Sequence, residues 1–250
     1  MSGHSKWAQI KRKKSVTDEK RGRMYSKLLR AIEVAAREGG GNVDGNMTLA
    51  SAVQKARDYS VPVDNIERAI KRGAGAGADA ARFEEVMYEG YGPGGVAILV
   101  EAMTDNRNRT GQEVRHTFSR LGGNLGDPGS VAWMFHRRGF IVVDRSVAPD
   151  EDGLMEIVLD AGAEDLRASG EQWEIVTSSD ALVAVRRALE EASVPVVSAE
   201  LSMLPQSAVP VDKGKAESVL RLVEALEDLE DVQAVHSNFD IPEEILAEAG

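Results

Sequence analysis

Apolar residues recur at helical spacing three times within the first 72 residues. Residues 1–14 show no such period, and we expect this arm to be mobile in the absence of a partner. The first helix is predicted to run from a capping hydroxyl near residue 15 to the three glycines at 39–41. A second is predicted over 47–57. Its predicted core residues are Leu49, Val53 and Ala56.

The third helical stretch follows Pro62. Asp64 and Glu67 have the spacing of a capping pair, and Gly73 is predicted to end the helix. The residues predicted to face inward are Ile66, Ala69 and Ile70, with Arg68, Lys71 and Arg72 on the other side. The stretch 73–81, rich in Gly and Ala, has the composition of a flexible linker. We therefore expect residues 1–80 to form a basic arm and a three-helix domain with its linker.

After the linker, the pattern becomes a mixture of strands and helices. Residues 83–89 and 96–103 are predicted strands, and Thr110 with Glu113 is predicted to open a helix that reaches Leu121. Residues 206–250 offer one amphipathic helix and one strand, at 232–239. Neither of these two segments can cover its own apolar face. We therefore expect 81–130 and 206–250 to pair into one discontinuous α/β domain.

Residues 131–205 are expected to close a core of their own. The pattern predicts a strand at 139–144, a helix at 151–161, a hairpin that turns at 168–170, a helix capped by Asp180, and a last strand at 194–204. The order β-α-β-β-α-β is that of a ferredoxin-like unit. The predicted class is therefore α+β, with an N-terminal three-helix domain and two ferredoxin-like α/β domains, one inserted in the other.

Charge is distributed unevenly along the chain. The first 30 residues contain ten Lys and Arg and two acids, a net charge of +8, so a chain total of −11 leaves −19 for the other 220 residues. A basic end on an acidic body indicates a polyanionic partner, and we favour nucleic acid over a merely solvated tail or a localisation signal. Trp7 could stack on an unpaired base. The predicted contact residues here are Lys6, Trp7, Lys11, Arg12, Lys13, Lys14, Lys20, Arg21, Arg23, Lys27 and Arg30, and Arg68, Lys71 and Arg72 extend the charge.

The sequence GYGPGG at 90–95 satisfies the pattern G-x-G-x-x-G. A dinucleotide site needs that loop between a strand and a helix, whose N-terminal N–H groups bind the pyrophosphate. Here a buried strand follows, and Pro93 removes one N–H donor. We interpret these residues as a tight hairpin turn.

The stretch TDNRNRT at 104–110 alternates arginine and asparagine between a strand and a helix. Arginine side chains and free N–H groups would suit an anion there. The equally weighted alternative is a solvated turn in which Asp105 and the asparagines cap the helix and the arginines pair with local acids. The candidate anion-binding residues are Asn106, Arg107, Asn108 and Arg109.

Nothing in the chain indicates an enzyme, a metal or a cofactor. There is no cysteine, the four histidines lack metal-ligand spacing, and no P-loop, nucleophile elbow or H-E-x-x-H motif is present. Acidic runs such as Glu227, Asp228, Glu230 and Asp231 are typical of solvated helix faces. No apolar run approaches the roughly 20 residues that span a bilayer, and no apolar stretch follows the basic start. We expect a cytoplasmic protein without membrane contact.

Long motifs between the N-terminus and Phe135 resemble the YebC/PmpR family. They are GHSKWAQIKRKK, KRGRMYSKLLRAIEVAAREGGG, VPVDNIERAIKRG, YEGYGPGGVAILVEAMTDNRNRT, EVRHTFSRLGGNLG and GSVAWMF. The resemblance implies a helical domain followed by two α/β domains, and no catalytic triad. Most of the predicted basic contact residues named above match basic positions of the family. Many relatives have arginines where this chain has Thr48 and Ala50, so we leave the second helix out of the predicted contact surface.

The resemblance implies a role in gene expression, described for the family in two ways. Most members are described as DNA-binding transcriptional regulators. Others, including the mitochondrial translational activator of cytochrome c oxidase, resemble ribosome-associated factors linked to relief of stalling at proline runs. We therefore expect a non-enzymatic regulator that binds promoter DNA or, as the alternative, ribosomal or transfer RNA on the ribosome. A third hypothesis is an α/β protein that senses an anion or a small molecule through residues 104–110.

Overall fold

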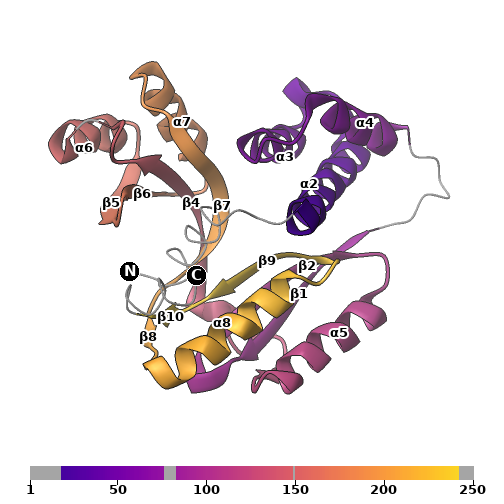
Figure 1. The fold of residues 1–250 in the computed structure, drawn as a ribbon. Coiled ribbons are helices and arrows are strands. Elements are labelled where there is room, and N and C mark those ends of the chain that lie inside the picture. Colours follow the sequence, from indigo (N-terminus) through magenta and orange to yellow (C-terminus); the bar gives the residue numbers. More distant parts are fainter. Residues whose placement is uncertain (1–17, 76–82, 149, 242–250) are drawn as a thin grey trace. The chain divides into compact units, whose positions relative to one another are not determined.

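The computed structural model describes residues 18–75, 83–148 and 150–241. The chain divides into two compact units. The first comprises the described residues of Met1–Ala56, Val61–Phe135 and Pro205–Gly250, and the second comprises Arg57–Ser60 and His136–Leu204. Helices at the start of the chain and two antiparallel four-stranded sheets after them confirm the α+β class (Figure 1).

The described part of the chain begins with the helices α2 (Asp18–Gly39), α3 (Met47–Asp58) and α4 (Val63–Ala74), with a short 3-10 turn at Val43–Gly45. The prediction for the second is confirmed, because Leu49, Val53 and Ala56 are its buried residues. The buried Asn46 joins two of these helices. Its amide nitrogen donates to the carbonyls of Ala35 (2.8 Å) and Gly40 (2.9 Å), and its oxygen accepts from the N–H of Leu49 (3.0 Å).

Two predicted features of α4 are wrong. Asp64 and Glu67 do not form a capping pair, because the helix already begins at Val63 and its N-cap is Pro62, which offers no side-chain acceptor. Gly73 does not end the helix, which continues to Ala74. A Cβ at Gly73 would lie 2.2 Å from the carbonyl oxygen of Glu33. This glycine is therefore required for the close packing of α4 on the backbone of α2.

The first sheet has the strand order β3-β1-β2-β9. The strands are β1 (Glu84–Tyr91), β2 (Ala97–Thr104), β3 (Asn124–Leu125) and β9 (Val232–Ser237), and every adjacent pair is antiparallel. Pairing of β2 with β9 brings together segments more than 120 residues apart in the sequence. A separate two-stranded ladder pairs β8 (Val209–Pro210) with β10 (Phe239–Asp240) in parallel.

The turn between β1 and β2 is the GYGPGG segment. It contains a 3-10 turn at Pro93–Gly95, in which Gly94 and Gly95 both have φ of +79°. The N–H of Gly92 donates to the carbonyl of Val96 across the turn (2.8 Å). Because this segment joins two antiparallel strands, the interpretation as a hairpin turn is confirmed.

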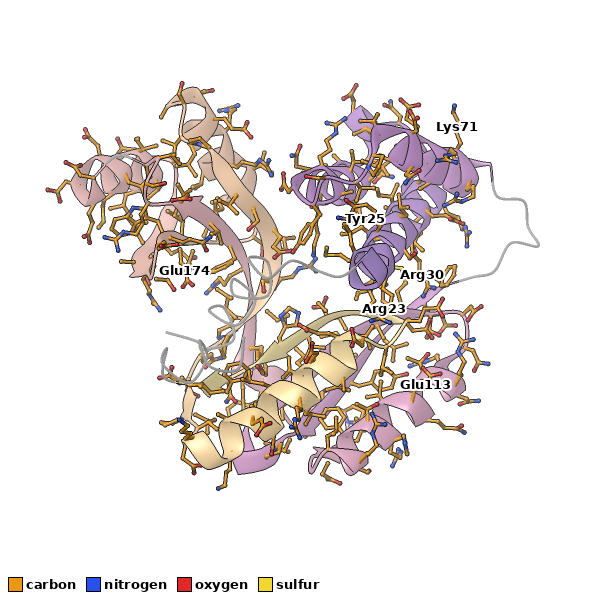
Figure 2. The ribbon with its side chains drawn as sticks, viewed as in Figure 1. Arg23, Tyr25, Arg30, Lys71, Glu113 and Glu174 are labelled. Atoms are coloured by element: carbon orange, nitrogen blue, oxygen red, sulfur yellow. The ribbon has the colours of Figure 1, made fainter. Side chains whose placement is uncertain are left out.

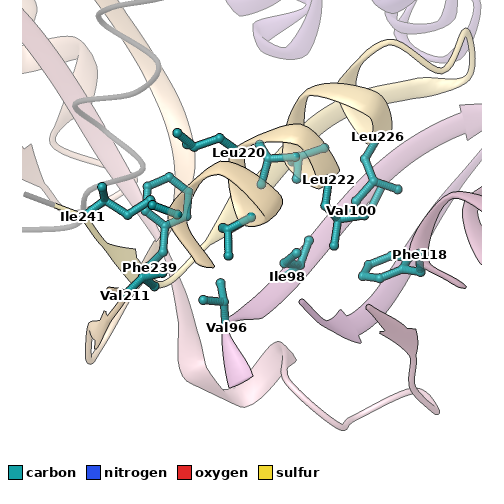
Figure 3. Close-up of a cluster of buried hydrophobic side chains, with 14 of the residues drawn as sticks. Val96, Ile98, Val100, Phe118, Val211, Leu220, Leu222, Leu226, Phe239 and Ile241 are labelled. Atoms are coloured by element: carbon teal, nitrogen blue, oxygen red, sulfur yellow. The ribbon is translucent and has the colours of Figure 1, made fainter. Parts of the chain in front are cut away.

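Helices α5 (Arg107–Arg120) and α8 (Lys213–Glu227) pack on one face of this sheet (Figure 1). Their apolar sides meet alternate residues of β2 in a single core (Figure 3). The prediction that Thr110 opens α5 is wrong. The helix begins at Arg107, because Asn106 caps it by accepting from the N–H of Arg109 (3.1 Å). Thr110 is instead buried, and its hydroxyl lies against β2.

The second unit contains the sheet β5-β6-β4-β7 and two helices. Its elements are β4 (Phe135–Asp144), α6 (Glu151–Asp160), β5 (Ala163–Ser169), β6 (Gln172–Thr177), α7 (Leu182–Glu191) and β7 (Val196–Pro205). The element order is the predicted β-α-β-β-α-β. The predicted cap of α7 by Asp180 is wrong, because its N-cap is Ala181, whose N–H donates to the hydroxyl of Ser178 (3.3 Å).

Candidate nucleic-acid interface

The predicted contact residues of the N-terminal arm lie outside the described residues. They are Lys6, Trp7, Lys11, Arg12, Lys13 and Lys14, and the side chain of Lys20 is likewise outside them. The described part of the candidate interface therefore consists of α2, α4 and the start of α5.

The clearest basic surface is the exposed side of α4, formed by Arg68, Lys71 and Arg72 and called here the basic face of α4. Its opposite side packs against α2. Arg72 pairs with Glu33 at 3.1 Å, and Arg68 bonds the Asp64 carbonyl at 3.1 Å. Among the described residues, Lys71 has no ion-pair partner, and it lies on the outer side of the helix (Figure 2). The pair of Arg72 with Glu33 is an exposed one, which contributes little free energy, and no carboxylate pairs with Arg68 among the described residues.

The cations Arg21, Arg23, Lys27 and Arg30 form a row along α2, called here the basic row of α2. It faces residues 227–231, called here the acidic turn, which connect α8 to β9 (Figure 2). Arg23 lies 3.6 Å from Asp228, and Lys27 donates to the carbonyl of Glu227. Arg30 pairs with Glu230 at 2.9 Å. These three predicted contact residues therefore already have anionic or carbonyl partners within the first unit. Arg21, at the start of the row, is exposed.

Asp231 contradicts the prediction that the acidic run is a solvated face. It is 3% exposed, and its carboxylate accepts from four side chains. They are Arg30 (2.9 Å), Arg109 (2.8 Å), Thr110 (2.7 Å) and Thr104 (3.0 Å). These donors come from α2, α5 and β2. Asp231 lies next to them because it directly precedes strand β9, which pairs with β2. Two arginines predicted as separate phosphate contacts, Arg30 and Arg109, thus meet on one buried carboxylate.

The electrostatics of this cluster follow from the contacts. Burial raises the pKa of Asp231, but hydrogen bonds from Arg109, Thr110, Thr104 and Arg30 outweigh it and lower the pKa from 3.8 to about 2. The bond to Asp231 is also the main cause of the raised pKa of Arg109. The carboxylate is therefore ionised at neutral pH, and both arginines are neutralised locally. Arg30 also stacks over Phe83, 5.0 Å from its ring centre.

Residues 104–110 form a helix start and not an open loop. Asn106 provides the cap, Arg109 pairs with Asp105 at 2.9 Å as well as with Asp231, and Arg107 lies 3.6 Å from Glu84. Asn108 is exposed. These contacts are those expected of a capped turn with locally paired arginines, and an anion site at Asn106, Arg107, Asn108 and Arg109 stays a prediction.

A second buried carboxylate, Glu89 on β1, was not predicted as a functional or structural centre. It accepts from the N–H groups of Gly129, Val131 and Ala132, each at 2.7 Å. Burial raises the pKa of Glu89, but these three bonds lower it below its usual value. The carboxylate thereby holds the loop that follows β3. The sequence signal was weak, since a lone Glu in a strand is ordinarily placed on the solvent side.

Within the described ranges, no group of three or more His, Asp or Glu side chains could hold a metal ion. In the same ranges, no helix is long and apolar enough to cross a membrane. A shallow hollow on α4 is lined by Asp64, Glu67, Arg68 and Lys71. Its polar, open lining differs from the enclosed apolar pockets that bind small molecules.

Comparisons with known proteins cover both parts of this architecture. Residues 5–76 match the model described as the TACO1/YebC protein N-terminal domain, and residues 83–239 match the TACO1/YebC second and third domain. The chain belongs to the TACO1/YebC family. Thus the basic face of α4 lies in the family's N-terminal domain, and Asp231 lies in the match to the second and third domain.

Relatives in the TACO1/YebC family match over their full lengths. A protein of Rubrobacter xylanophilus is 53% identical over 248 residues, which is 99% of each chain, and one of Thermobifida fusca is 55% identical over 247 residues, again 99% of each. Both are named probable transcriptional regulatory protein. The crystal structure of a conserved hypothetical protein from Aquifex aeolicus is 48% identical, with a TM-score of 0.86 over 96% of this chain and 98% of that one.

Proposed function

We propose that this protein is a non-enzymatic regulator of gene expression that binds duplex DNA through its N-terminal arm and the basic face of α4. The observation that carries the proposal is the separation of charge. Residues 1–72 contain 16 basic and 8 acidic side chains, whereas the chain as a whole carries −11. The names of the relatives, which refer to transcriptional regulation, support the same function.

The contacts of the described residues indicate which cations would bind phosphate. Arg23, Lys27 and Arg30 have partners in the acidic turn, so we assign them a secondary role. The phosphate contacts would come mainly from the arm and from Arg68, Lys71 and Arg72. An acidic remainder repels a phosphate backbone and so favours one orientation of the protein on it.

We also infer the domain organisation that this function uses. Residues 1–80 would form the binding domain and its linker, and 81–130 with 206–250 would form a discontinuous α/β domain. Residues 131–205 would form a ferredoxin-like domain inserted into it. The pairing of β2 with β9 and the core shared by α5 and α8 support this division.

The test measures binding of the full chain to duplex DNA and to single-stranded RNA by fluorescence anisotropy over a series of salt concentrations. Two variants are compared with the wild type: a deletion of residues 1–14, and a triple substitution Arg68→Gln, Lys71→Gln and Arg72→Gln. Each lost phosphate contact on B-DNA reduces the log–log salt slope by about 0.9, so the triple variant should lose about 2.7. Its affinity should fall at least tenfold.

The matched control removes three exposed arginines from the acidic remainder, Arg137→Gln, Arg187→Gln and Arg221→Gln. It changes the net charge by the same amount and should leave the salt slope of DNA binding unchanged. An equal loss of DNA affinity in the control and in the triple variant of Arg68, Lys71 and Arg72, called here the α4 variant, would contradict a localised interface. Wild-type affinity and slope in both the arm deletion and the α4 variant would overturn the proposed function.

A second candidate, binding to RNA in a translating ribosome, is favoured by Trp7 in the basic arm, because an aromatic side chain among cations suits unpaired bases. The substitution Trp7→Ala separates the two. It should weaken single-stranded RNA binding severalfold and leave duplex binding unchanged. Crosslinking in cells followed by sequencing of the bound nucleic acid then distinguishes promoter DNA from ribosomal RNA.

A further inference from the structure

Helix α5 carries the highest net positive charge of the described helices. Its 14 residues include four arginines and one glutamate, a net charge of +3. The corresponding values are +2 for α2, +1 for α4 and zero for α8, which packs beside α5 on the same sheet. This concentration of charge lies outside the arm and the helical region, in the acidic remainder of the chain.

The arginines of α5 divide into two kinds. Arg107 and Arg109, in the first turn, pair with carboxylates of neighbouring segments. Arg115 and Arg120, in the later turns, are exposed, and no ion pair connects either to another described residue. The later turns of α5 therefore carry two exposed arginines that no described carboxylate neutralises.

Polar side chains that can form hydrogen bonds occupy the surface between these cations. The exposed positions are Asn108, Gln112, His116 and Ser119. On a helix of 3.6 residues per turn they form one strip, with Arg115 along one edge and Arg120 along the other. Glu113 is the single acid of the helix (Figure 2). We call Arg115, Arg120 and this strip the outer face of α5.

The outer face of α5 is held rigidly. Val114 and Phe118, on the opposite side of the helix, are completely buried in the core of the first unit. Gly90 of β1 brings the strand against the Phe118 ring, since a Cβ there would lie 2.8 Å from it. These contacts fix which side of the helix faces the sheet, so the outer face of α5 is turned towards solvent.

We propose that the outer face of α5 is a second binding surface for the phosphodiester backbone of the nucleic acid that the protein binds. Guanidinium groups are the side chains best suited to phosphate, and amide and hydroxyl groups between them donate to sugar and phosphate oxygens. Charge complementarity selects this occupant, since the two arginines that flank the strip, which no described carboxylate neutralises, attract a polyanion locally, although the acidic remainder repels it elsewhere. The proposal rests on the proposed function and adds a contact surface in the second matched region of the family.

The experiment uses the absence of cysteine from the chain. The variant Ser119→Cys places a single thiol on the outer face of α5, and Ser218→Cys places one at an exposed position of α8 as a control. Each is labelled with a photoactivatable maleimide and irradiated with labelled duplex DNA or single-stranded RNA. The Ser119→Cys protein should crosslink to the nucleic acid that the wild type binds, and the Ser218→Cys protein should not.

Binding measurements complete the test. The double variant Arg115→Gln, Arg120→Gln should bind about tenfold more weakly and lose about 1.8 from the salt slope on duplex DNA. Glu113→Gln should bind two- to threefold more tightly, roughly the effect of removing one like charge near phosphate. Circular dichroism checks that the variants remain folded.

The outcomes separate this proposal from the proposed function. If the α4 variant loses binding while the α5 double variant binds as tightly as the wild type, the outer face of α5 is not a contact and the proposed function stands. Equal crosslinking from Ser119→Cys and Ser218→Cys also overturns the α5 surface. If the wild type binds neither DNA nor RNA, both proposals fail.

Discussion

Asp231 shows how one buried carboxylate can connect three elements. Its two oxygens accept hydrogen bonds from donors on α2, α5 and β2, and its own carbonyl accepts from the N–H of Met103 (2.8 Å). A buried ionised group is stable only when its hydrogen-bonding capacity is filled, and here it is filled by two guanidinium and two hydroxyl groups. Removal of the charge would leave Arg30 and Arg109 with only the exposed carboxylates of Glu230 and Asp105, and the two hydroxyl groups with no ionised acceptor at this position.

We predict that Asp231→Asn lowers the free energy of unfolding by about 3 kcal/mol at neutral pH, the range for breaking a buried ion pair. The control is Glu230→Gln, which removes a carboxylate that bonds the same Arg30 but is 83% exposed. Its cost should stay below about 0.5 kcal/mol, as for other surface pairs. Denaturant unfolding measures both, and equal costs would show that burial of Asp231 is unimportant.

The effect of Asp231 should depend on pH. Its pKa is about 2 in the folded protein, below the ordinary 3.8, so its ionised form stabilises the fold above pH 4 and this contribution is lost as pH falls towards 2. The difference in stability between wild type and Asp231→Asn should therefore shrink by about 2 kcal/mol between about pH 5 and pH 2. A difference that stays constant over this range would contradict the assigned pKa.

The helices α2 and α4 pack closely because glycine replaces a side chain at their contact. Gly73 faces the carbonyl of Glu33 and the methyl group of Ala36. Close approach of the two helices lets Arg72 reach Glu33 and directs the basic face of α4 outward. The orientation of the candidate interface therefore depends on a residue that carries no charge.

We predict that Gly73→Ala destabilises the protein by about 3 kcal/mol, because overpacking against a backbone carbonyl cannot be relieved by a rotamer change. Gly22→Ala is the matched control. Gly22 lies in the interior of α2 with no atom within 4 Å of its added Cβ, so the substitution should stabilise the protein by about 1 kcal/mol. Thermal unfolding of the two variants should shift in opposite directions, and a neutral Gly73→Ala would contradict the packing.

Elements with regular periodicity could be predicted from the sequence, and their ends and polar contacts could not. Leu49, Val53 and Ala56 showed the buried face of α3 because helical spacing of apolar residues depends only on neighbours in sequence. The role of Gly73 depends on a residue 40 positions away, so its local interpretation as a helix end was wrong. Asp231 was assigned to solvent for the same reason, because its four donors lie at least 121 residues away.

In the first unit, a group of basic side chains lies close to a group of acidic ones. The basic row of α2 meets the acidic turn, so carboxylates of the protein occupy cations that a phosphate backbone would otherwise contact. Phosphate that contacted these cations would have to compete with the carboxylates of the acidic turn. Asp228 and Glu230 are exposed members of the acidic turn and can be changed without disturbing the buried Asp231.

We predict that Asp228→Asn with Glu230→Gln strengthens nucleic-acid binding about fivefold, because it removes the exposed pair of Asp228 with Arg23 and two negative charges that repel phosphate beside α2. Arg30 keeps its bond to Asp231 in this variant. The control, Asp152→Asn with Glu156→Gln, removes two exposed charges from α6 in the second unit. These two charges belong to no proposed contact surface, so the control should change the affinity by less than about twofold. Anisotropy titrations at one salt concentration compare the two. Equal gains would assign the effect to net charge alone, and a weaker acidic-turn variant would mean that these carboxylates organise α2 for binding and do not compete with phosphate.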